Sequence, residues 1–311
     1  MDHIDVAIVG GGPAGLAAAL YSARALVNTV VFESGLPGGQ IVTTDRLENY
    51  PGFPEGISGA EIGVLMHAQA EKFGAFFRTF EAVHALEAVD GDWKLSYDGG
   101  DILAHAVIVA TGAVPKKLGI PGEAEFTGRG VSWCATCDGA LFRDKEVAVI
   151  GGGDAADEEA QFLTRFASRV HLVHRREELR ATKVVAEACV AHEQIQMHWN
   201  RSPAEVRGED GKVTGVLLRS TRDEPDEILP VSGVFEFVGV DPKSEFVRGV
   251  ADLDEHGFIK VDHLARTSAP GLYAAGDVTD TPLKQVVTAA AQGAIAGFEA
   301  SRYVESRTCT L

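Results

Sequence analysis

Cysteine is scarce in this chain, with four in 311 residues. So few cannot form a disulfide framework in a chain of this length, and we therefore expect a cytoplasmic protein. No uncharged apolar run reaches the roughly 18 residues that a membrane-spanning helix needs. The acidic first residues lead at once into an apolar run, which predicts a strand rather than a secretory signal.

Positive charge is also scarce: 28 Lys and Arg face 45 Asp and Glu, giving a formal net charge of -17. Nucleic acid is therefore not expected as the main partner, because phosphate binding needs concentrated Lys and Arg. The ten histidines show no ligand spacing, and no second Cys-x-x-Cys exists, so no metal site is expected. With 45% hydrophobic residues the composition is that of an ordinary globular protein.

Glycine, by contrast, is abundant, and a glycine pattern occurs twice. Residues 6–15 and 147–156 are each an apolar run followed by a glycine turn. A helix is predicted after each turn (residues 16–25 and 158–167), and then another β-branched run (29–32 and 170–173). Strand, glycine turn, helix and strand form the βαβ unit of a doubly wound parallel sheet. The sequence thus predicts an α/β protein with two Rossmann-like nucleotide-binding domains.

The first unit predicts an adenine dinucleotide site. Gly10 makes the tight turn, Gly12 admits a pyrophosphate to backbone N–H groups, and Gly15 allows close helix packing. Pro13 and Ala14 lie between Gly12 and Gly15, in the predicted turn. Glu33 ends the second strand, where a carboxylate can accept hydrogen bonds from a ribose diol.

The second unit differs at the end of its second strand, where His174, Arg175 and Arg176 stand and Arg180 follows. Arginines at this point can bind a 2′-phosphate, which a carboxylate would repel. The alternative is a solvated basic helix start, partly neutralised by Glu177 and Glu178. We interpret the second unit as an NADPH site whose turn comprises Gly151, Gly153, Asp154, Ala155 and Ala156.

Two further segments suggest that the first domain resumes after the second. Residues 107–112 and 267–277 each contain a short apolar run that ends in small residues, Ala110-Thr111-Gly112 and Gly276-Asp277. An uncharged helix is predicted over residues 286–298; Asp277 could otherwise be an ordinary helix cap. We therefore predict a split domain, residues 1–114 and 244–311, with a second domain, 115–243, inserted in it.

Cys134 and Cys137 form a single Cys-x-x-Cys motif, followed directly by Asp138. Thiols at this spacing can close a disulfide, and a helix start would lower a thiol pKa. Asp138 can hold or donate a proton as a thiolate forms or leaves. Structural zinc would require two further ligands, and a hydrolytic cysteine would require neither the second thiol nor a flavin.

Together these motifs resemble prokaryotic-type, low-molecular-weight NADPH-dependent thioredoxin reductases, which are flavin-disulfide reductases, over essentially the whole chain. The resemblance implies a homodimer with FAD in the split domain, NADPH in the inserted one, and thioredoxin or a thioredoxin-like protein as partner. It implies that Cys137 is nearest the flavin, that Cys134 attacks the partner's disulfide, and that a hinge rotation alternates the flavin's access. The further residues it places at the cofactors are Ser34, Gly39, Gln40, Asn49, Ala110, Thr111, Gly112, Gly276, Asp277, Lys284 and Gln285.

Three points depart from that pattern or leave it open. Asp157 stands where the family usually has an apolar residue; we expect it to face solvent, the alternative being weakened NADPH binding. Cys189 is expected in a core and Cys309 in a frayed tail. The competing functions are a reductase of the same fold that uses ferredoxin or a deazaflavin, a dithiol oxidase, and a non-catalytic redox sensor. The glycine turn at residues 151–156 and the arginines disfavour the first two, and Asp138 disfavours the third.

Overall fold

The structure is a computed structural model that describes residues 3–44, 47, 49–222 and 224–308. The side chains of Thr43, Thr136, Cys137 and Thr308 lie outside the described part. None of the helices in that part combines the length and the apolar composition that a membrane span requires.

The chain folds into two compact units, one formed by residues 1–114 and 241–311 and the other by residues 115–240. The second unit is therefore inserted in the sequence of the first. The two crossing segments pair with each other as strands β7 (Ala113–Pro115) and β16 (Val240–Pro242).

The split unit is built on a seven-stranded sheet of order β3-β2-β1-β6-β5-β4, with β17 also paired to β6. β1, β2, β3, β6 and β17 are parallel, while β4 and β5 form an antiparallel extension on β6. Because β17 comes from the second segment, that segment completes the sheet of the first. The strands are β1 (His3–Val9), β2 (Thr29–Glu33), β3 (Phe76–Thr79), β4 (Val83–Val89), β5 (Asp92–Tyr97), β6 (Gly100–Val109) and β17 (Leu272–Ala274).

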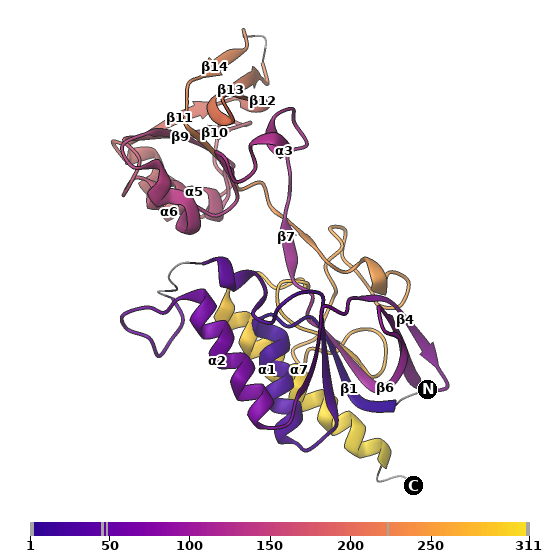
Figure 1. The fold of residues 1–311 in the computed structure, drawn as a ribbon. Coiled ribbons are helices and arrows are strands. Elements are labelled where there is room, and N and C mark those ends of the chain that lie inside the picture. Colours follow the sequence, from indigo (N-terminus) through magenta and orange to yellow (C-terminus); the bar gives the residue numbers. More distant parts are fainter. Residues whose placement is uncertain (1–2, 45–46, 48, 223, 309–311) are drawn as a thin grey trace. The chain divides into compact units, whose positions relative to one another are not determined.

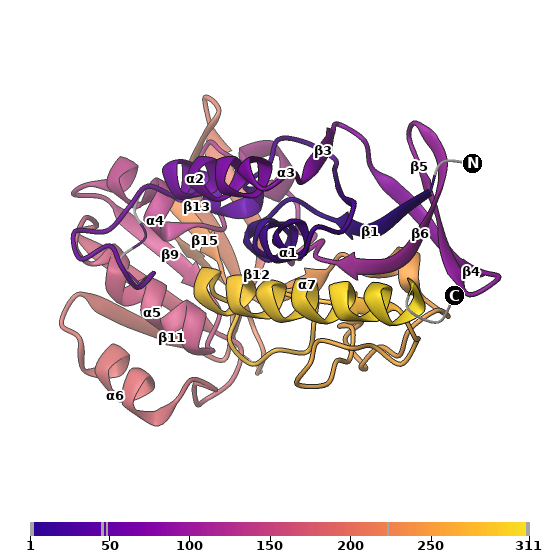
Figure 2. The ribbon, with the colours of Figure 1, turned by 90° about the horizontal axis from the view of Figure 1, so that it is seen from below.

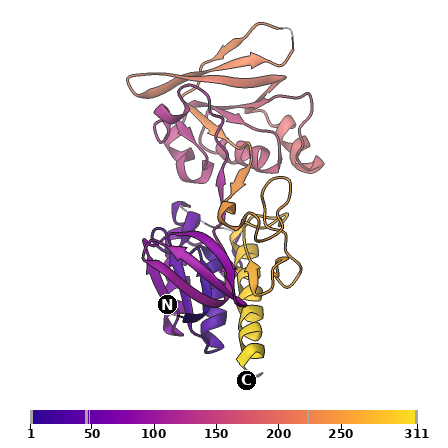
Figure 3. The same ribbon diagram turned by 90° about the vertical axis from the view of Figure 1, so that its right-hand side faces the viewer.

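Three helices pack on this sheet, and α1 lies between α2 and α7 (Figure 2). Figure 3 shows α7, in yellow, running beside the strands. The backbones of α1 and α7 approach closely: a Cβ on Gly293 would lie 2.0 Å from the Ala14 carbonyl oxygen. The helices are α1 (Pro13–Arg24), α2 (Gly59–Lys72) and α7 (Val286–Thr308), with short 3-10 turns η1 (Gly39–Thr43) and η3 (Glu245–Val247).

The inserted unit has a five-stranded parallel sheet of order β11-β10-β9-β15-β8 and a three-stranded antiparallel sheet, β12-β13-β14. Helices α5 and α6 lie together on one side of the parallel sheet (Figure 1). A second apolar cluster joins its other face to β12, β13 and β14. The strands are β8 (Val131–Ser132), β9 (Glu146–Ile150), β10 (Arg169–His174), β11 (Ile195–Trp199), β12 (Arg201–Glu209), β13 (Lys212–Ser220), β14 (Glu227–Leu229) and β15 (Gly233–Glu236).

The remaining elements of this unit are α3 (Glu123–Phe126), α4 (Ala135–Asp138), η2 (Gly139–Phe142), α5 (Asp154–Leu163) and α6 (Lys183–Ala191). The predicted α/β class with two Rossmann-like units is confirmed, since each unit has a parallel sheet that begins strand, glycine turn, helix, strand. Helices α1 and α5 begin three and four residues earlier than predicted, directly after the glycines, and α7 continues ten residues further.

Candidate functional site

The glycine turn of residues 10–15 is required in part by packing alone. Gly10 has a positive φ of 105°, and a Cβ there would lie 2.4 Å from the Ala110 carbonyl oxygen. A Cβ on Gly15 would lie 1.8 Å from the carbonyl oxygen of Gly10. No side chain fits at either position, so β1, the turn and α1 can meet only through glycine.

Gly12 is different, because packing does not demand it. It caps α1 with φ -76°, which any residue can adopt, and the nearest atom to a Cβ would be 3.8 Å away. The space beside the Gly12 Cα is therefore open, and Pro13 is the first helical residue. An open helix N-terminus with backbone N–H groups facing outward suits a pyrophosphate.

Glu33 lies at the end of β2 and is held against this turn. Its Oε2 accepts the Gly11 N–H at 2.7 Å, and its Oε1 accepts the Gly35 N–H at 2.9 Å and the Ser34 hydroxyl at 3.2 Å. A carboxylate offers about four acceptor positions, so one remains for a ribose hydroxyl. The fold thus brings Glu33 and Ser34 to the glycine turn as the sequence predicts.

The second segment of the split unit returns to the same place. A Cβ on Gly276, whose φ is 79°, would lie 2.9 Å from the Cβ of Ala14 in α1. Thr111 donates to the Lys243 carbonyl at 2.6 Å, and Gly112 accepts the Lys243 N–H at 2.9 Å. The turns at 10–15, 110–112 and 276–277 therefore form one neighbourhood.

Asp277 and Lys284 add two partly desolvated charged groups to this neighbourhood. Burial raises the pKa of Asp277, an effect that the charge of Lys284 partly offsets. Burial also lowers the pKa of Lys284, although Asp277 opposes the change. The Lys284 ammonium donates to the carbonyls of Asp277 and Thr279, each at 3.1 Å, and lies 3.9 Å from the Phe258 ring centroid. Such desolvated groups beside a helix start are candidates for contact with a polar ligand.

The side chains of Gln40, Asn49 and Gln285 also lie in this unit. Gln40 donates to the Ala113 carbonyl, and Asn49 donates to Gln285 at 3.0 Å. The Asn49–Gln285 bond joins residues far apart in the sequence, one before the inserted unit and one after it. Gly39, whose φ is 63°, packs against Gly12.

The second glycine turn repeats the first in a different unit. A Cβ on Gly151 would lie 2.4 Å from that of Ala156, and one on Gly152 would lie 2.2 Å from His174. His174 is buried, and its ring bonds to the Gly151 carbonyl at 2.7 Å. A Cβ on Gly153 would meet nothing within 4 Å. As at Gly12, the glycine at the helix start is unexplained by packing and leaves room for a ligand.

Arg175, Arg176 and Arg180, here called the arginine cluster, are all exposed beside this turn. Arg180 is tied to it, because its N–H donates to the Gly152 carbonyl at 2.6 Å. Glu177 forms an ion pair with Arg222 instead of neutralising the cluster. None of the three guanidinium groups forms an ion pair with a described residue, so they can bind an anion.

Asp157 does not face solvent, so that expectation is wrong. The side chain is wholly buried, and neither carboxyl oxygen has a hydrogen-bond partner among the described residues. Because α5 begins at Asp154, position 157 falls on the face of the helix that includes Ala160 and turns toward the core. Burial, and to a lesser degree the charge of Asp154, raises the pKa of Asp157 to about 6.

Cys189 is wholly buried in the apolar cluster between the sheet and α5, as expected for a core residue. Burial, with a smaller effect of Asp157, raises the pKa of its thiol to about 12. It is therefore an unreactive thiol at neutral pH. Cys309, for which a frayed tail was expected, lies outside the described residues.

Cys134 is disulfide-bonded and half-buried, between β8 and α4. The Ser132 hydroxyl accepts its N–H at 3.0 Å, and its carbonyl accepts the Asp138 N–H at 3.2 Å. The side chain of Cys137 lies outside the described part. The helix after Cys134 spans only Ala135–Asp138, so its dipole can lower a thiol pKa less than the predicted helix start would.

Glu236 and Trp133 are two neighbours of this segment that the sequence reading missed. The parallel pairing of Phe235 with Ser132 places Glu236 beside Trp133, next to Cys134. Glu236 is 1% exposed, and burial, with the nearby Glu123 carboxyl, raises its pKa to about 8. Its position at the end of an apolar strand, in a Val-Phe-Glu-Phe run, is the signal that could have identified it.

Known proteins resemble this chain in sequence and in fold. The family model described as pyridine nucleotide-disulphide oxidoreductase matches residues 4–293. The thioredoxin reductase of Listeria innocua is 45% identical over 97% of this chain and 94% of its own length, and that of Mycolicibacterium smegmatis is 47% identical over 96% of each. The crystal structure of Lactococcus lactis thioredoxin reductase, 40% identical, aligns over 97% of this chain and 99% of its own with a TM-score of 0.85.

Proposed function

Because the chain belongs to the thioredoxin reductases of the pyridine nucleotide-disulphide oxidoreductase family, we propose that it is an NADPH-dependent flavoprotein that reduces thioredoxin through a Cys134–Cys137 disulfide. FAD, when bound, supplies the two-electron relay between NADPH and this disulfide. The observation that carries the proposal is the disulfide-bonded Cys134, in a unit that also has an open glycine turn beside arginines that form no ion pair with a described residue.

FAD is assigned to the split unit, as the FAD-binding domain of residues 1–114 and 244–311. The open space at Gly12 fits a pyrophosphate, and Glu33 fits the ribose of the adenosine half. Asp277, Lys284 and the Asn49–Gln285 pair would hold the flavin half. Lys284 bonds to the Asp277 carbonyl directly after the turn at Gly276, and the Asn49–Gln285 bond joins the two segments of the unit. The other residues assigned to FAD are Gly10, Pro13, Ala14, Gly15, Ser34, Gly39, Gln40, Ala110, Thr111, Gly112 and Gly276.

NADPH is assigned to the inserted unit, as the domain of residues 115–243. Gly153 leaves room for the pyrophosphate at the start of α5, and the arginine cluster would bind the 2′-phosphate. His174 would position the turn, since its ring already bonds to Gly151. Asp154 is held by the Thr182 N–H at 2.7 Å, which joins the turn to the start of α6. Gly151, Ala155 and Ala156 complete the assigned residues.

The chain's own chemistry would be thiol–disulfide exchange. In the reduced pair, the Cys134 thiolate attacks the disulfide of thioredoxin, forming a mixed disulfide and releasing one thioredoxin thiolate. Asp138 is assigned to donate the proton that this leaving thiolate takes up. Cys137 then attacks Cys134, which restores the intramolecular disulfide and releases the second thioredoxin sulfur, so two electrons pass to the partner.

We also assign the protein a cytoplasmic location, a homodimeric state and a thioredoxin-like partner. The low cysteine content supports the location, because structural disulfides are uncommon in that compartment. The partner and the dimer rest on the resemblance to thioredoxin reductases.

The test is an anaerobic titration of the purified protein with NADPH and, separately, NADH, followed by flavin absorbance. We expect NADPH to bleach the flavin at far lower concentration than NADH. Thioredoxin reduction should be lost in Cys134→Ser while bleaching remains. Bleaching by dithionite but by neither nicotinamide would contradict the NADPH assignment and direct the search to ferredoxin or a deazaflavin.

The arginine cluster is tested by Arg176→Ala, with Arg219→Ala as control. Arg219 is also exposed in the inserted unit but pairs with Asp226 at 3.8 Å on the β12–β14 sheet. Loss of a charged contact to the 2′-phosphate should raise KM for NADPH about tenfold or more and leave that for NADH unchanged. Equal effects of the two substitutions would remove the cluster from the site.

A further inference from the structure

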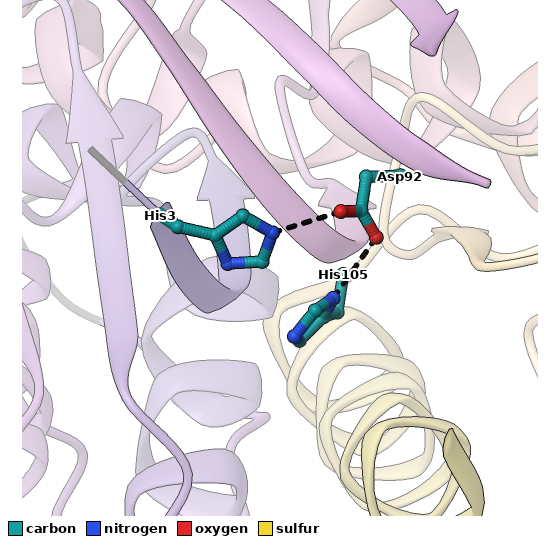
Figure 4. A group of neighbouring side chains, drawn as sticks. All are labelled: His3, Asp92 and His105. Carbon is teal, nitrogen blue, oxygen red and sulfur yellow. Dashed lines mark hydrogen bonds and ion pairs between the residues drawn. The ribbon is translucent and has the colours of Figure 1, made fainter. Parts of the chain in front are cut away.

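His3, Asp92 and His105 are brought together at the surface of the split unit, away from the glycine turns. They come from β1, β5 and β6, and β6 lies between the other two strands in the sheet. Figure 4 shows both imidazole rings directed at the one carboxylate. His3 Nε2 is 2.8 Å from Asp92 Oδ2, and His105 Nδ1 is 2.9 Å from Asp92 Oδ1.

The three side chains offer two imidazole nitrogens and one carboxylate oxygen, with the donor atoms within 4.8 Å of one another. Zinc bonds to such ligands at about 2.0–2.2 Å, so neighbouring donors in a tetrahedral site lie roughly 3.3 Å apart. Binding would require the side chains to rotate, because the two imidazoles now contact different oxygens of Asp92. The three ligands would leave a fourth position for water.

We propose that His3, Asp92 and His105 form a binding site for a divalent transition-metal ion such as Zn²⁺. Imidazole with carboxylate is a ligand set that favours Zn²⁺ and its transition-metal neighbours over Mg²⁺ or Ca²⁺. The net charge of -17 also favours accumulation of cations near the protein.

Two charged groups affect cation binding at this site in opposite directions: the Asp92 carboxylate favours it and the Arg307 guanidinium opposes it. Burial alone would raise the pKa of Asp92, but hydrogen bonds from His3 and His105 and the charge of Arg307 lower it to about 2, so the carboxylate is ionised. Arg307 opposes a second cation, because its Nη1 lies 2.8 Å from Asp92 Oδ1. The same guanidinium donates to the Gly91 carbonyl at 2.7 Å, which would anchor it while the carboxylate turns to a metal.

A metal ion at this site would link three strands and change the contact between Asp92 and Arg307 at the end of α7. His3 begins β1, Asp92 begins β5, and Arg307 is in the last turn of α7. Since the ion binds only the folded arrangement, it should stabilise the split unit.

The experiment is a calorimetric titration of the oxidised protein, free of any affinity tag, with zinc chloride. The oxidised form is used because the Cys134 disulfide cannot then bind zinc as thiolate. We expect one site per chain and a zinc-dependent rise in the thermal unfolding midpoint. His3→Ala and His105→Ala should each weaken binding by more than about tenfold, since even loss of an outer-shell partner costs 10- to 100-fold.

Two further variants separate this site from non-specific binding. His84→Ala removes another exposed histidine paired with an aspartate, Asp98 at 2.6 Å, and should bind zinc as the unsubstituted protein does. Arg307→Gln removes the opposing charge and should bind zinc more tightly. Absence of binding, or equal affinity in the His3, His105 and His84 variants, would overturn the proposal.

Discussion

At the scale of single residues, the inserted unit buries two carboxyl groups, Asp157 and Glu236, without hydrogen bonds from described residues. A buried carboxylate is costly, so each group retains its proton to higher pH than in water. Glu236 shows the larger effect, with a pKa of about 8 against an ordinary 4.5. It lies beside Trp133, the residue before Cys134, so its charge state bears on the segment that carries the disulfide.

Glu236→Gln should stabilise the protein in a pH-dependent way. Below pH 4.5 Glu236 is protonated in both folded and unfolded chains, and the substitution should change little. Between about pH 4.5 and 8 only the unfolded chain ionises, so the folded state loses stability as pH rises. At roughly 1.4 kcal/mol per pKa unit, the variant's advantage should reach on the order of 4 kcal/mol at pH 8.

The measurement is urea unfolding of both proteins at intervals from pH 5 to 8.5. The difference in unfolding free energy should grow with pH and then level off. Two parallel stability curves would mean that Glu236 ionises normally in the folded protein.

At the scale of elements, the starts of α1 and α5 explain how one sequence pattern serves two purposes. Gly15 and Gly151 must be glycine because other atoms of the same unit already occupy the place of a Cβ. These atoms are the Gly10 carbonyl oxygen at Gly15, and the Ala156 Cβ at Gly151. Gly12 and Gly153 are glycine although a Cβ at either position would clash with no protein atom. The first kind maintains the contact of strand and helix, and the second leaves a helix N-terminus accessible to phosphate.

Gly12→Ala should therefore impair FAD binding, whereas Gly15→Ala should impair folding stability. Gly12→Ala should fold with an unfolding free energy within about 0.5 kcal/mol of the parent when FAD is removed from both, but it should retain FAD poorly. Gly15→Ala should lose about 3 kcal/mol or more, because a Cβ would lie 1.8 Å from a backbone oxygen. Circular dichroism melts and flavin content distinguish the two; equal FAD retention in Gly12→Ala and the parent would contradict the assigned pyrophosphate site.

At the scale of the whole molecule, each unit has its own apolar cores. The clusters around Ile8 and Val107 belong to the split unit, and those around Leu163 and Val234 to the inserted one. Units with separate cores can be stabilised separately by their ligands.

Hydrogen exchange should therefore divide along the same boundary. Adding FAD to the FAD-free protein should slow exchange mainly in residues 1–114 and 241–311. NADP⁺ should slow it mainly in 115–240, most strongly around residues 151–156 and 175–180. Protection of the same unit by both ligands would contradict the assignment of one nucleotide to each.

Much of this organisation could be predicted from the sequence, and the reason is that the relevant signals are local. The repeated strand, glycine turn and helix depend on residues close in the chain, as does the Cys134–Cys137 spacing. The predicted membership of the thioredoxin reductases is confirmed by full-length relatives at 45% and 47% identity. Helix limits were less well predicted, since α7 continues to Thr308 through a charged stretch in which Ala300 and Val304 are buried.

The sequence by itself therefore determined the two βαβ units, the redox motif and the charge reversal from Glu33 to the arginine cluster. Only the tertiary structure decided which glycines packing requires, that Asp157 is buried, and that His3, Asp92 and His105 meet on one sheet. Those facts depend on which strand lies beside which and on which face of a helix turns inward. Pairings between residues about 90 apart leave no periodic trace in the chain, so they exist only once the sheet has formed.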